Sequence, residues 1–445
     1  MTTTFSNEQI LALAPDASAA KAGEAMASPR KWLSLGCSPT ALWGECQGSA
    51  RDPYRTQIDL RGPAFRCSCP SRKLPCKHSL GLFLLFARAA ERFDTAAPPD
   101  WAAEWLARRD AQAQKAAATP PTPPEDDAEA TARRATSQAR TAAAREAKVA
   151  AGIEELSRWL RDLVRRGLAQ AQSQPASFWN TMAARLIDAQ APGLARRVRD
   201  LATVPASGMG WQERMLAQIG QLHLLCASYP RIAQLPLATQ ADIRTAIGWP
   251  QREADLATEP GMRDYWLVLG QRVEEEEQMR TQRTWLWGQR SAQPALVLNF
   301  AMFNQPLDRS LLPGSALDAE LVFFPSAVPL RAVVRERLGL AGGLGDFPGE
   351  PYCADALARY ATALAQHPWL ERSLVALSAG IPAYQAGSWW LRDQAGDALP
   401  LARGFTRGWQ LLALSGGAPL AIAGEWDGTA LLPLSAWADG EFYVL

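Results

Sequence analysis

The chain has 445 residues, of which 48% are hydrophobic, and this is enough for two or three domains that each bury a core. Its 46 Lys and Arg residues balance 45 Asp and Glu residues, which excludes a strong overall field toward nucleic acid or an anionic membrane. No apolar stretch reaches the roughly 20 residues of a membrane-spanning helix, and the first ten residues lack the pattern of a secretory signal. We therefore expect a cytoplasmic protein without a membrane partner.

The first hundred residues predict a short helical lead-in followed by a small ββα module. A capping-box pattern at residues 6–9 opens an apolar run, so residues 1–40 are expected to be a helical lead-in. Residues 42–47 and 54–60 have the composition of two strands that form a hairpin. The almost wholly apolar run 79–93 predicts a helix buried against that hairpin. The module is expected to cover residues 41–107.

Three cysteines and one histidine lie close together between the hairpin and the helix, in the pattern C-x-C-x6-C-x-H. Such crowding in a reducing compartment indicates a metal site rather than disulfides. Three thiolates and one imidazole complete the tetrahedral coordination of zinc and leave no position for water or substrate. We therefore predict one structural zinc ion, and its four ligands are Cys67, Cys69, Cys76 and His78. Two further cysteines, Cys37 and Cys46, are interpreted as strand or loop thiols, with extra ligands or redox-sensitive thiols as the alternative.

The hairpin, the C-x-C-x6-C-x-H pattern and the following helix together resemble the SWIM zinc finger. The resemblance covers residues 41–92, and the longer match of residues 43–49, 67–73 and 75–78 resembles bacterial SWIM-finger proteins of uncharacterised role. It implies zinc ligation by the four residues, a ββα fold, and binding to DNA or to other proteins.

The middle of the chain predicts a linker and then a helical domain. Large apolar residues nearly vanish between residues 108 and 150, which predicts a disordered or partly helical linker. Helical periodicity returns over residues 151–283, which we interpret as a helical domain. Its expected helices cover residues 153–164, 178–187, 194–204, 211–228 and 263–280.

The last part of the chain, residues 284–445, predicts a mixed domain of strands and helices. Strand-like runs at 284–287, 295–300 and 320–324 precede a helical run at 354–366, and short strands are expected from residue 389 to the end. The fold class is therefore α+β, with a zinc-stapled module, a linker, a helical domain and a mixed domain. Six tryptophans are expected to pack in the core of the last part, and a row of exposed ones would instead indicate a base-stacking or peptide-binding surface. They are Trp369, Trp389, Trp390, Trp409, Trp426 and Trp437.

Four basic residues flank the predicted zinc ligands and make the zinc loop the candidate recognition surface. They either offset the charge of the thiolates or contact phosphate or a protein partner. We predict an adaptor or regulatory protein that uses its finger to bind a protein or a nucleic acid, with DNA binding through the basic loop as the alternative. The candidate contacts are Arg66, Arg72, Lys73 and Lys77.

The scarcity of histidine argues against an enzyme. Apart from His78, only His223 and His367 exist, and His223 pairs with Cys226 on a helix whose pattern favours a core histidine and a core thiol. The sequence contains no Walker loop, dinucleotide-binding glycine motif or H-E-x-x-H motif. The acidic run 274–277 is interpreted as the solvated face of a helix. We therefore expect no catalysis and no small-molecule substrate, with a carboxylate-based site in the C-terminal body as the less favoured alternative.

Overall fold

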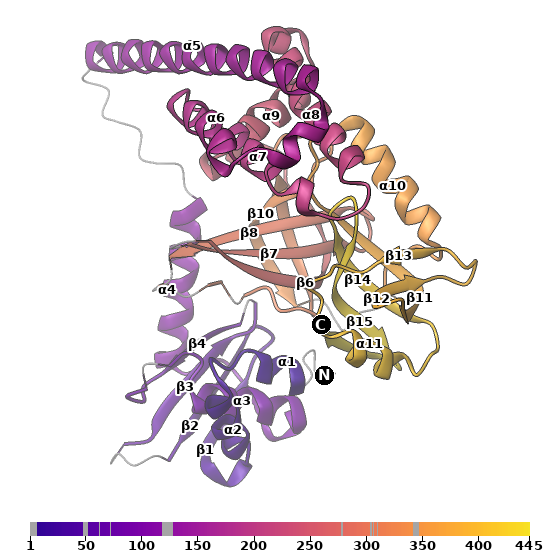
Figure 1. Ribbon diagram of the computed structural model, residues 1–445. Coiled ribbons are helices and arrows are strands. Elements are labelled where there is room, and N and C mark those ends of the chain that lie inside the picture. Colours follow the sequence, from indigo (N-terminus) through magenta and orange to yellow (C-terminus); the bar gives the residue numbers. More distant parts are fainter. Residues whose placement is uncertain are drawn as a thin grey trace.

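The computed structural model describes residues 7–47, 52–61, 63–71, 73–117, 128–276, 279–302, 305, 307–308, 310–340 and 347–445. It has an N-terminal α/β module, a bundle of helices, and a C-terminal body in which a β-barrel packs on an open sheet (Figure 1). The predicted α+β class is confirmed. No helix among these residues is long and apolar enough to cross a membrane.

The N-terminal module is built on a five-stranded sheet rather than on a hairpin alone. Its strands follow the order β4-β3-β2-β1-β5, and helices α1, α2 and α3 pack over one face around buried Leu42, Ile58 and Phe83. Helices α2 and α3 cross closely because glycines lie at the contact: a Cβ on Gly81 would lie 2.4 Å from the Cβ of Met26. The bounds are α1 Asn7–Ala12, α2 Ala17–Met26, β1 Trp32–Cys37, β2 Ala41–Cys46, β3 Tyr54–Asp59, β4 Ala64–Cys67, α3 Lys77–Arg88 and β5 Asp94–Thr95.

The second face of this sheet is covered by helix α4, Asp100–Ala117. Trp101, Ala102 and Leu106 of this helix pack on Ala41 and Trp43 of the sheet. The module therefore has three layers, and the expected ββα unit is only its central part. The chain is helical on both sides of residues 118–127, because α5 begins at Ala128, so most of the segment expected as a linker is helix.

The helical bundle follows, with α5 Ala128–Arg166, α6 Ala176–Asp188, α7 Pro192–Leu201, α8 Trp211–Ser228 and α9 Leu237–Ile247. Its core is formed by the apolar stripes of all five helices, in which Leu156, Leu186, Val198, Leu225 and Ile243 are fully buried. The four helices predicted between residues 153 and 228 are confirmed.

Strands begin at Met262, earlier than the expected change at residue 284. β6 (Met262–Glu276) and β7 (Met279–Gly288) form a hairpin, so the helix predicted over 263–280 is wrong. The apolar run there is buried on both sides: Trp266 and Val268 point into the barrel, whereas Leu267 and Leu269 pack against the C-terminal sheet. A strand buried on both faces does not alternate, and its periodicity cannot be told from that of a buried helix.

The barrel closes in the order β10-β8-β7-β6-β9, with β8 and β10 parallel and the other pairs antiparallel. This Greek-key connectivity is that of a five-stranded OB-type barrel. Its remaining strands are β8 Pro294–Met302, β9 Ala316–Phe323 and β10 Arg331–Leu340.

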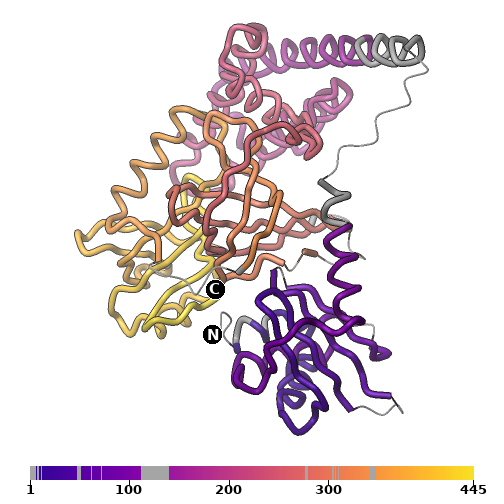
Figure 2. Tube along the Cα trace, turned by 180° about the vertical axis from the view of Figure 1, so that it is seen from behind, coloured from indigo at the N-terminus to yellow at the C-terminus, as the bar shows by residue number. Residues whose placement is uncertain are grey.

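The chain ends in a six-stranded sheet in the order β13-β12-β11-β14-β15-β16, which Figure 2 shows from behind beside the barrel. Leu374, Ala423 and Leu434 of this part pack against Leu267 and Trp285 of the barrel, so the two form one body. Its elements are α10 Cys353–Gln366, β11 Ser373–Gln385, β12 Ser388–Arg392, β13 Ala398–Pro400, α11 Gly408–Ser415, β14 Leu420–Trp426, β15 Leu431–Ala438 and β16 Glu441–Val444.

Candidate metal centre

Two neighbouring elements of the N-terminal module hold the cysteine and histidine cluster. Cys67 is the last residue of β4, and the ladder between β3 and β4 continues one residue further because Ser68 N–H donates to the Arg55 carbonyl at 3.0 Å. Cys76 lies at the N-cap of α3 and His78 in its first turn. The zinc loop, residues 68–75, joins the two elements and carries Cys69. It brings Cys76 and His78, at the start of α3, close to Cys67 and Cys69.

The four side chains converge to the spacing of a tetrahedral metal site. Their ligand atoms all lie within 4.8 Å of one another. His78 Nδ1 lies 3.8 Å from Cys67 Sγ and 4.0 Å from Cys76 Sγ. Tetrahedral zinc with its usual bond lengths holds such donor atoms about 3.5–3.8 Å apart. The cluster is therefore compatible with one structural zinc ion, and no other group of three or more such side chains occurs in the described part of the chain.

The environment of the cluster favours a thiolate at Cys76. A hydrogen bond from Cys67, reinforced by His78 and Ser79, lowers the pKa of the Cys76 thiol to about 3. The same hydrogen bond and burial raise the pKa of Cys67, and burial raises that of Cys69. The Cys76 sulfur also lies at the N-terminus of α3, where the backbone N–H groups favour negative charge. Cys76 is thus the cysteine whose surroundings most favour the thiolate, and a bound cation would displace the protons of the other two cysteines.

Hydroxyl groups around the cluster orient its sulfur atoms. Thr56 Oγ1 lies 3.1 Å from Cys67 Sγ, and Ser79 Oγ lies 3.4 Å from Cys76 Sγ. The ring of Tyr54 packs against that of His78 with centroids 5.1 Å apart. Sequence reasoning missed these residues, although the alternation along β3 places Tyr54 and Thr56 on one face, and Thr56 is paired with Cys67. Partners of this kind fix the geometry of a metal site.

Comparison with known families agrees with this geometry. A model of the SWIM zinc finger matches residues 54–86, which include all four residues of the cluster. A model of the SWIM-associated four-helix bundle domain matches residues 144–247, from within α5 to the end of α9. The chain carries a SWIM finger and its associated bundle domain. The bundle was not recognised from the sequence. No curated protein and no solved structure matches the chain.

The basic surface of the SWIM finger is smaller than the sequence predicts. Lys73 Nζ donates to Asp16 Oδ2 at 2.7 Å, so its charge is already paired. Arg66 and Lys77 are exposed and form no salt bridge with a described residue. Arg72 lies outside the described residues. Two unpaired cations therefore flank the zinc loop, one on β4 and one at the start of α3, and the side chain of Leu74 in the loop is exposed.

The remaining thiols and histidines do not assemble a second site. Cys37 and Cys46 are buried at the ends of β1 and β2, as strand thiols. Cys226 is a core thiol, and burial raises its pKa to about 12. His223, however, is exposed on α8, so its assignment to the core is wrong. His223 and Cys226 are three residues apart and therefore lie on neighbouring parts of the surface of α8. Cys226 lies on the part that packs against the core, whereas His223 lies on the part that faces solvent.

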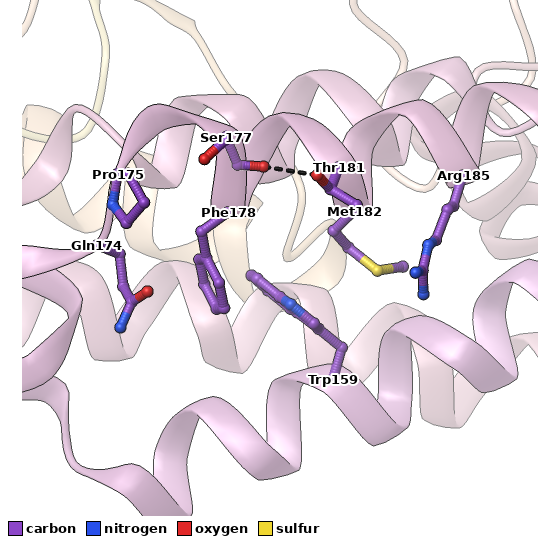
Figure 3. Close-up of a pocket in the computed structure, with 8 residues that line it drawn as sticks. All are labelled: Trp159, Gln174, Pro175, Ser177, Phe178, Thr181, Met182 and Arg185. Atoms are coloured by element: carbon purple, nitrogen blue, oxygen red, sulfur yellow. Dashed lines mark hydrogen bonds between the residues drawn. The ribbon is translucent and has the colours of Figure 1, made fainter.

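A shallow groove of about 360 Å³ lies between α5 and α6 of the bundle domain (Figure 3). The rings of Trp159 and Phe178 lie 5.2 Å apart in it, Thr181 Oγ1 donates to the Ser177 carbonyl, and Arg185 pairs with Glu155. None of its lining residues has a buried polar atom without a hydrogen-bond partner. The groove therefore holds no buried, unpartnered side-chain group that would mark a ligand site.

Proposed function

We propose that the protein is a non-enzymatic regulatory adaptor of the cytoplasm whose SWIM finger binds a partner protein through the zinc loop. The observation that carries this proposal is the coverage of the finger's sheet. Helices α1, α2 and α3 occupy one face and α4 occupies the other. In the zinc loop, Pro70, Ser71 and Leu74 are exposed, and this part of the finger is open to a partner.

The chemistry of the zinc loop suits a protein partner. Leu74 is 59% exposed, and Pro70 of the same loop is also exposed. A metal ion that holds both ends of the loop fixes its conformation, so binding costs little ordering entropy. The two unpaired cations, Arg66 and Lys77, flank this apolar tip and would add charge selectivity at its rim.

The zinc ligands and the buried thiols are poorly suited to catalysis. SWIM fingers are typically binding modules, and three thiolates with one imidazole fill the coordination of zinc. Burial raises the pKa of Cys226 and of Cys353 to about 12, so both thiols stay protonated at neutral pH and are poor nucleophiles.

A nucleic acid is the second candidate partner, because Arg66 and Lys77 lie unpaired near the N-terminus of α3. Two phosphate contacts give a slope of only about −1.8 in a plot of log affinity against log salt concentration, which is typical of weak, non-specific binding. The small charge of this surface therefore favours a protein.

We expect Leu74→Glu to abolish partner capture. The intact zinc-loaded chain would be used as bait in cross-linked extracts of its source cells, with bound proteins quantified by mass spectrometry. Leu33→Glu is the matched control, because Leu33 is 63% exposed in the same module but lies on β1, away from the zinc loop. A protein retained by the wild type and by Leu33→Glu but lost with Leu74→Glu supports the proposal. Identical sets from all three baits would contradict it.

The nucleic-acid alternative predicts a different result in an anisotropy titration. Labelled single- and double-stranded DNA and RNA would be titrated with the zinc-loaded chain at two salt concentrations, beside the Arg66→Ala/Lys77→Ala variant. We expect no binding tighter than about 100 μM at physiological salt, the weak end of non-specific affinity. Micromolar, salt-sensitive binding that the variant loses would assign the zinc loop to nucleic acid instead.

A further inference from the structure

Three aromatic side chains meet at the surface of the C-terminal sheet, far from the SWIM finger in the sequence. Tyr384 is 50% exposed and Trp409 is 65% exposed, and Trp389 lies half-buried between them. The ring centroids are 4.9 Å apart for Tyr384 and Trp389, 5.4 Å for Tyr384 and Trp409, and 5.0 Å for Trp389 and Trp409. We call these three residues the aromatic corner. The corner departs from the expectation that the C-terminal tryptophans are buried, which Trp369 and Trp426 fulfil, whereas Trp390 and Trp437 are half-buried.

The aromatic corner is fixed by the backbone on which it lies. Tyr384 and Trp389 are directly opposite each other in the antiparallel β11–β12 pair, so their side chains share one face of the sheet. Trp409 is the second residue of α11, which packs on β11. A Cβ on Gly408 would lie 2.1 Å from the ring of Trp389, so only glycine at this position lets that ring lie against the start of the helix. The corner is thus preformed, which lowers the entropic cost of binding.

The angles between the rings restrict what the aromatic corner can hold. The planes of Trp389 and Trp409 meet at 84°, and Tyr384 is tilted by 50° and 47° to them. Rings about 5 Å apart touch one another, so no space remains between them for a methylated ammonium group. What remains open is the outward face of Trp409 and of Tyr384. Proline rings dock on such exposed aromatic faces when a peptide adopts the polyproline II helix.

The chain itself contains a peptide with this chemistry. Residues 119–127 read Thr-Pro-Pro-Thr-Pro-Pro-Glu-Asp-Asp, in which two overlapping P-x-x-P patterns precede three acidic residues. Exposed Arg407, at the N-cap of α11, lies two residues before Trp409 in the sequence. Its positive charge is complementary to the acidic end of the peptide. We propose that the aromatic corner binds the proline-rich segment 119–127 of a second copy of this chain.

The arrangement of the fold explains why the segment comes from another molecule. It follows α4, which lies on the side of the molecule away from α11 and the C-terminal sheet (Figures 1 and 2). The two contacting surfaces are different, so the contact is heterologous, and it joins copies head to tail into a ring or an open chain. This inference is independent of the zinc loop and of its partner.

A labelled peptide of residues 116–130 titrated with the full zinc-loaded chain tests the contact directly. We expect micromolar binding, followed by anisotropy, and a loss of at least about tenfold with Trp409→Ala, because a truncated tryptophan at a contact typically costs that much. A peptide with its four prolines replaced by alanine is expected to bind at least about tenfold more weakly. Phe300→Ala is the matched control, because Phe300 is also 50% exposed but lies on β8 of the barrel. Circular dichroism of each variant checks that it is folded.

Sedimentation velocity of the intact chain tests the consequence. We expect the average sedimentation coefficient to rise with protein concentration for the wild type and for Phe300→Ala. It is expected to stay constant for Trp409→Ala and for the chain in which the four prolines of segment 119–127 are alanines. Equal binding of the proline-free peptide, or unchanged association of both variants, overturns the proposal. Binding of a single-stranded oligonucleotide or an oligosaccharide that depends on Trp409, without binding of the peptide, overturns it as well.

Discussion

Replacing Cys76 by serine is expected to abolish stoichiometric zinc binding and to unfold the N-terminal module. Cys76 supplies the sulfur whose pKa is lowered to about 3, and it also begins α3. Structural zinc contributes on the order of 10 kcal/mol to the folding of such modules, which exceeds the total stability of many small domains. Metal analysis should show less than about a tenth of the wild-type zinc content. Limited proteolysis should then cut within residues 7–117 and leave the bundle and the C-terminal body intact.

Cys37→Ser provides the control for this experiment. Cys37 is equally buried in the same module, but its sulfur lies near Thr95 on the far edge of the sheet and outside the cluster. We expect this variant to retain one zinc ion per chain and the proteolysis pattern of the wild type. Full zinc content in Cys76→Ser would contradict the assignment of the cluster as the zinc site.

The cysteine cluster was predictable because its information is local. The two strands, the four side chains and the start of the helix lie within a short stretch of sequence, and the spacing C-x-C-x6-C-x-H specifies both the ligands and their geometry. The ion pair of Lys73 could not be predicted in this way. Its partner, Asp16, lies 57 positions away at the N-cap of α2, and no pattern in the sequence joins the two.

The elements that extend and cover the sheet of the SWIM finger could not be predicted either, because they come from distant parts of the chain. β1 and β5 complete the sheet from positions far apart in the chain, and the parallel pair between them is only two residues long. Helix α4 lies partly in a segment whose low apolar content predicts a linker. Its apolar contacts with the sheet come from its first turns, with Trp101 and Leu106, and Arg109 adds an ion pair with Asp59 of β3. A helix that uses so short a contact has no sustained apolar stripe to reveal it.

The prediction of a helix in place of β6 also assigns its acidic residues to the wrong surroundings. The acidic run from Glu274 does not lie on a solvated helix. Glu274 pairs instead with Arg283 at 2.5 Å and with Arg272 at 3.2 Å, on strands that face the C-terminal sheet. Glu274 therefore belongs to the junction between the barrel and the sheet, whereas Glu275 is exposed and Glu277 lies outside the described residues.

Glu425→Ala is expected to give a large loss of stability at that junction. Glu425 lies on β14 and is 1% exposed. Its Oε2 accepts a hydrogen bond from Trp285 Nε1 at 3.0 Å, and its Oε1 accepts one from Arg372 Nη1 at 2.5 Å. Two further guanidinium groups, of Arg272 and Arg283, lie 3.7 and 3.8 Å from Oε1. The carboxylate of Glu425 thus contacts three guanidinium groups and a buried indole N–H.

Truncation of Glu425 leaves the three guanidinium groups with Glu274 as their remaining carboxylate partner, and it leaves the indole N–H without its acceptor. Removing one partner of a buried charge pair typically costs about 3–5 kcal/mol, because the remaining charge is desolvated and unpaired. At about 2–4 °C per kcal/mol for a body of this size, the thermal transition of the C-terminal body should fall by about 10 °C in calorimetry. Zinc content should not change, because the cluster lies in the other module.

Two companion variants show whether charge or shape governs this effect. Glu425→Gln keeps an acceptor for Trp285 but removes the negative charge, so it should lose most of the same stability if the arginines dominate. Glu154→Ala, on the exposed surface of α5, should shift the transition by less than about 1 °C, since surface substitutions change stability by only about 0.5 kcal/mol or less. A Glu425→Ala transition as high as that of Glu154→Ala would show that the carboxylate is not needed to join the barrel to the sheet. The barrel and the C-terminal sheet would then be held together by their apolar contact alone.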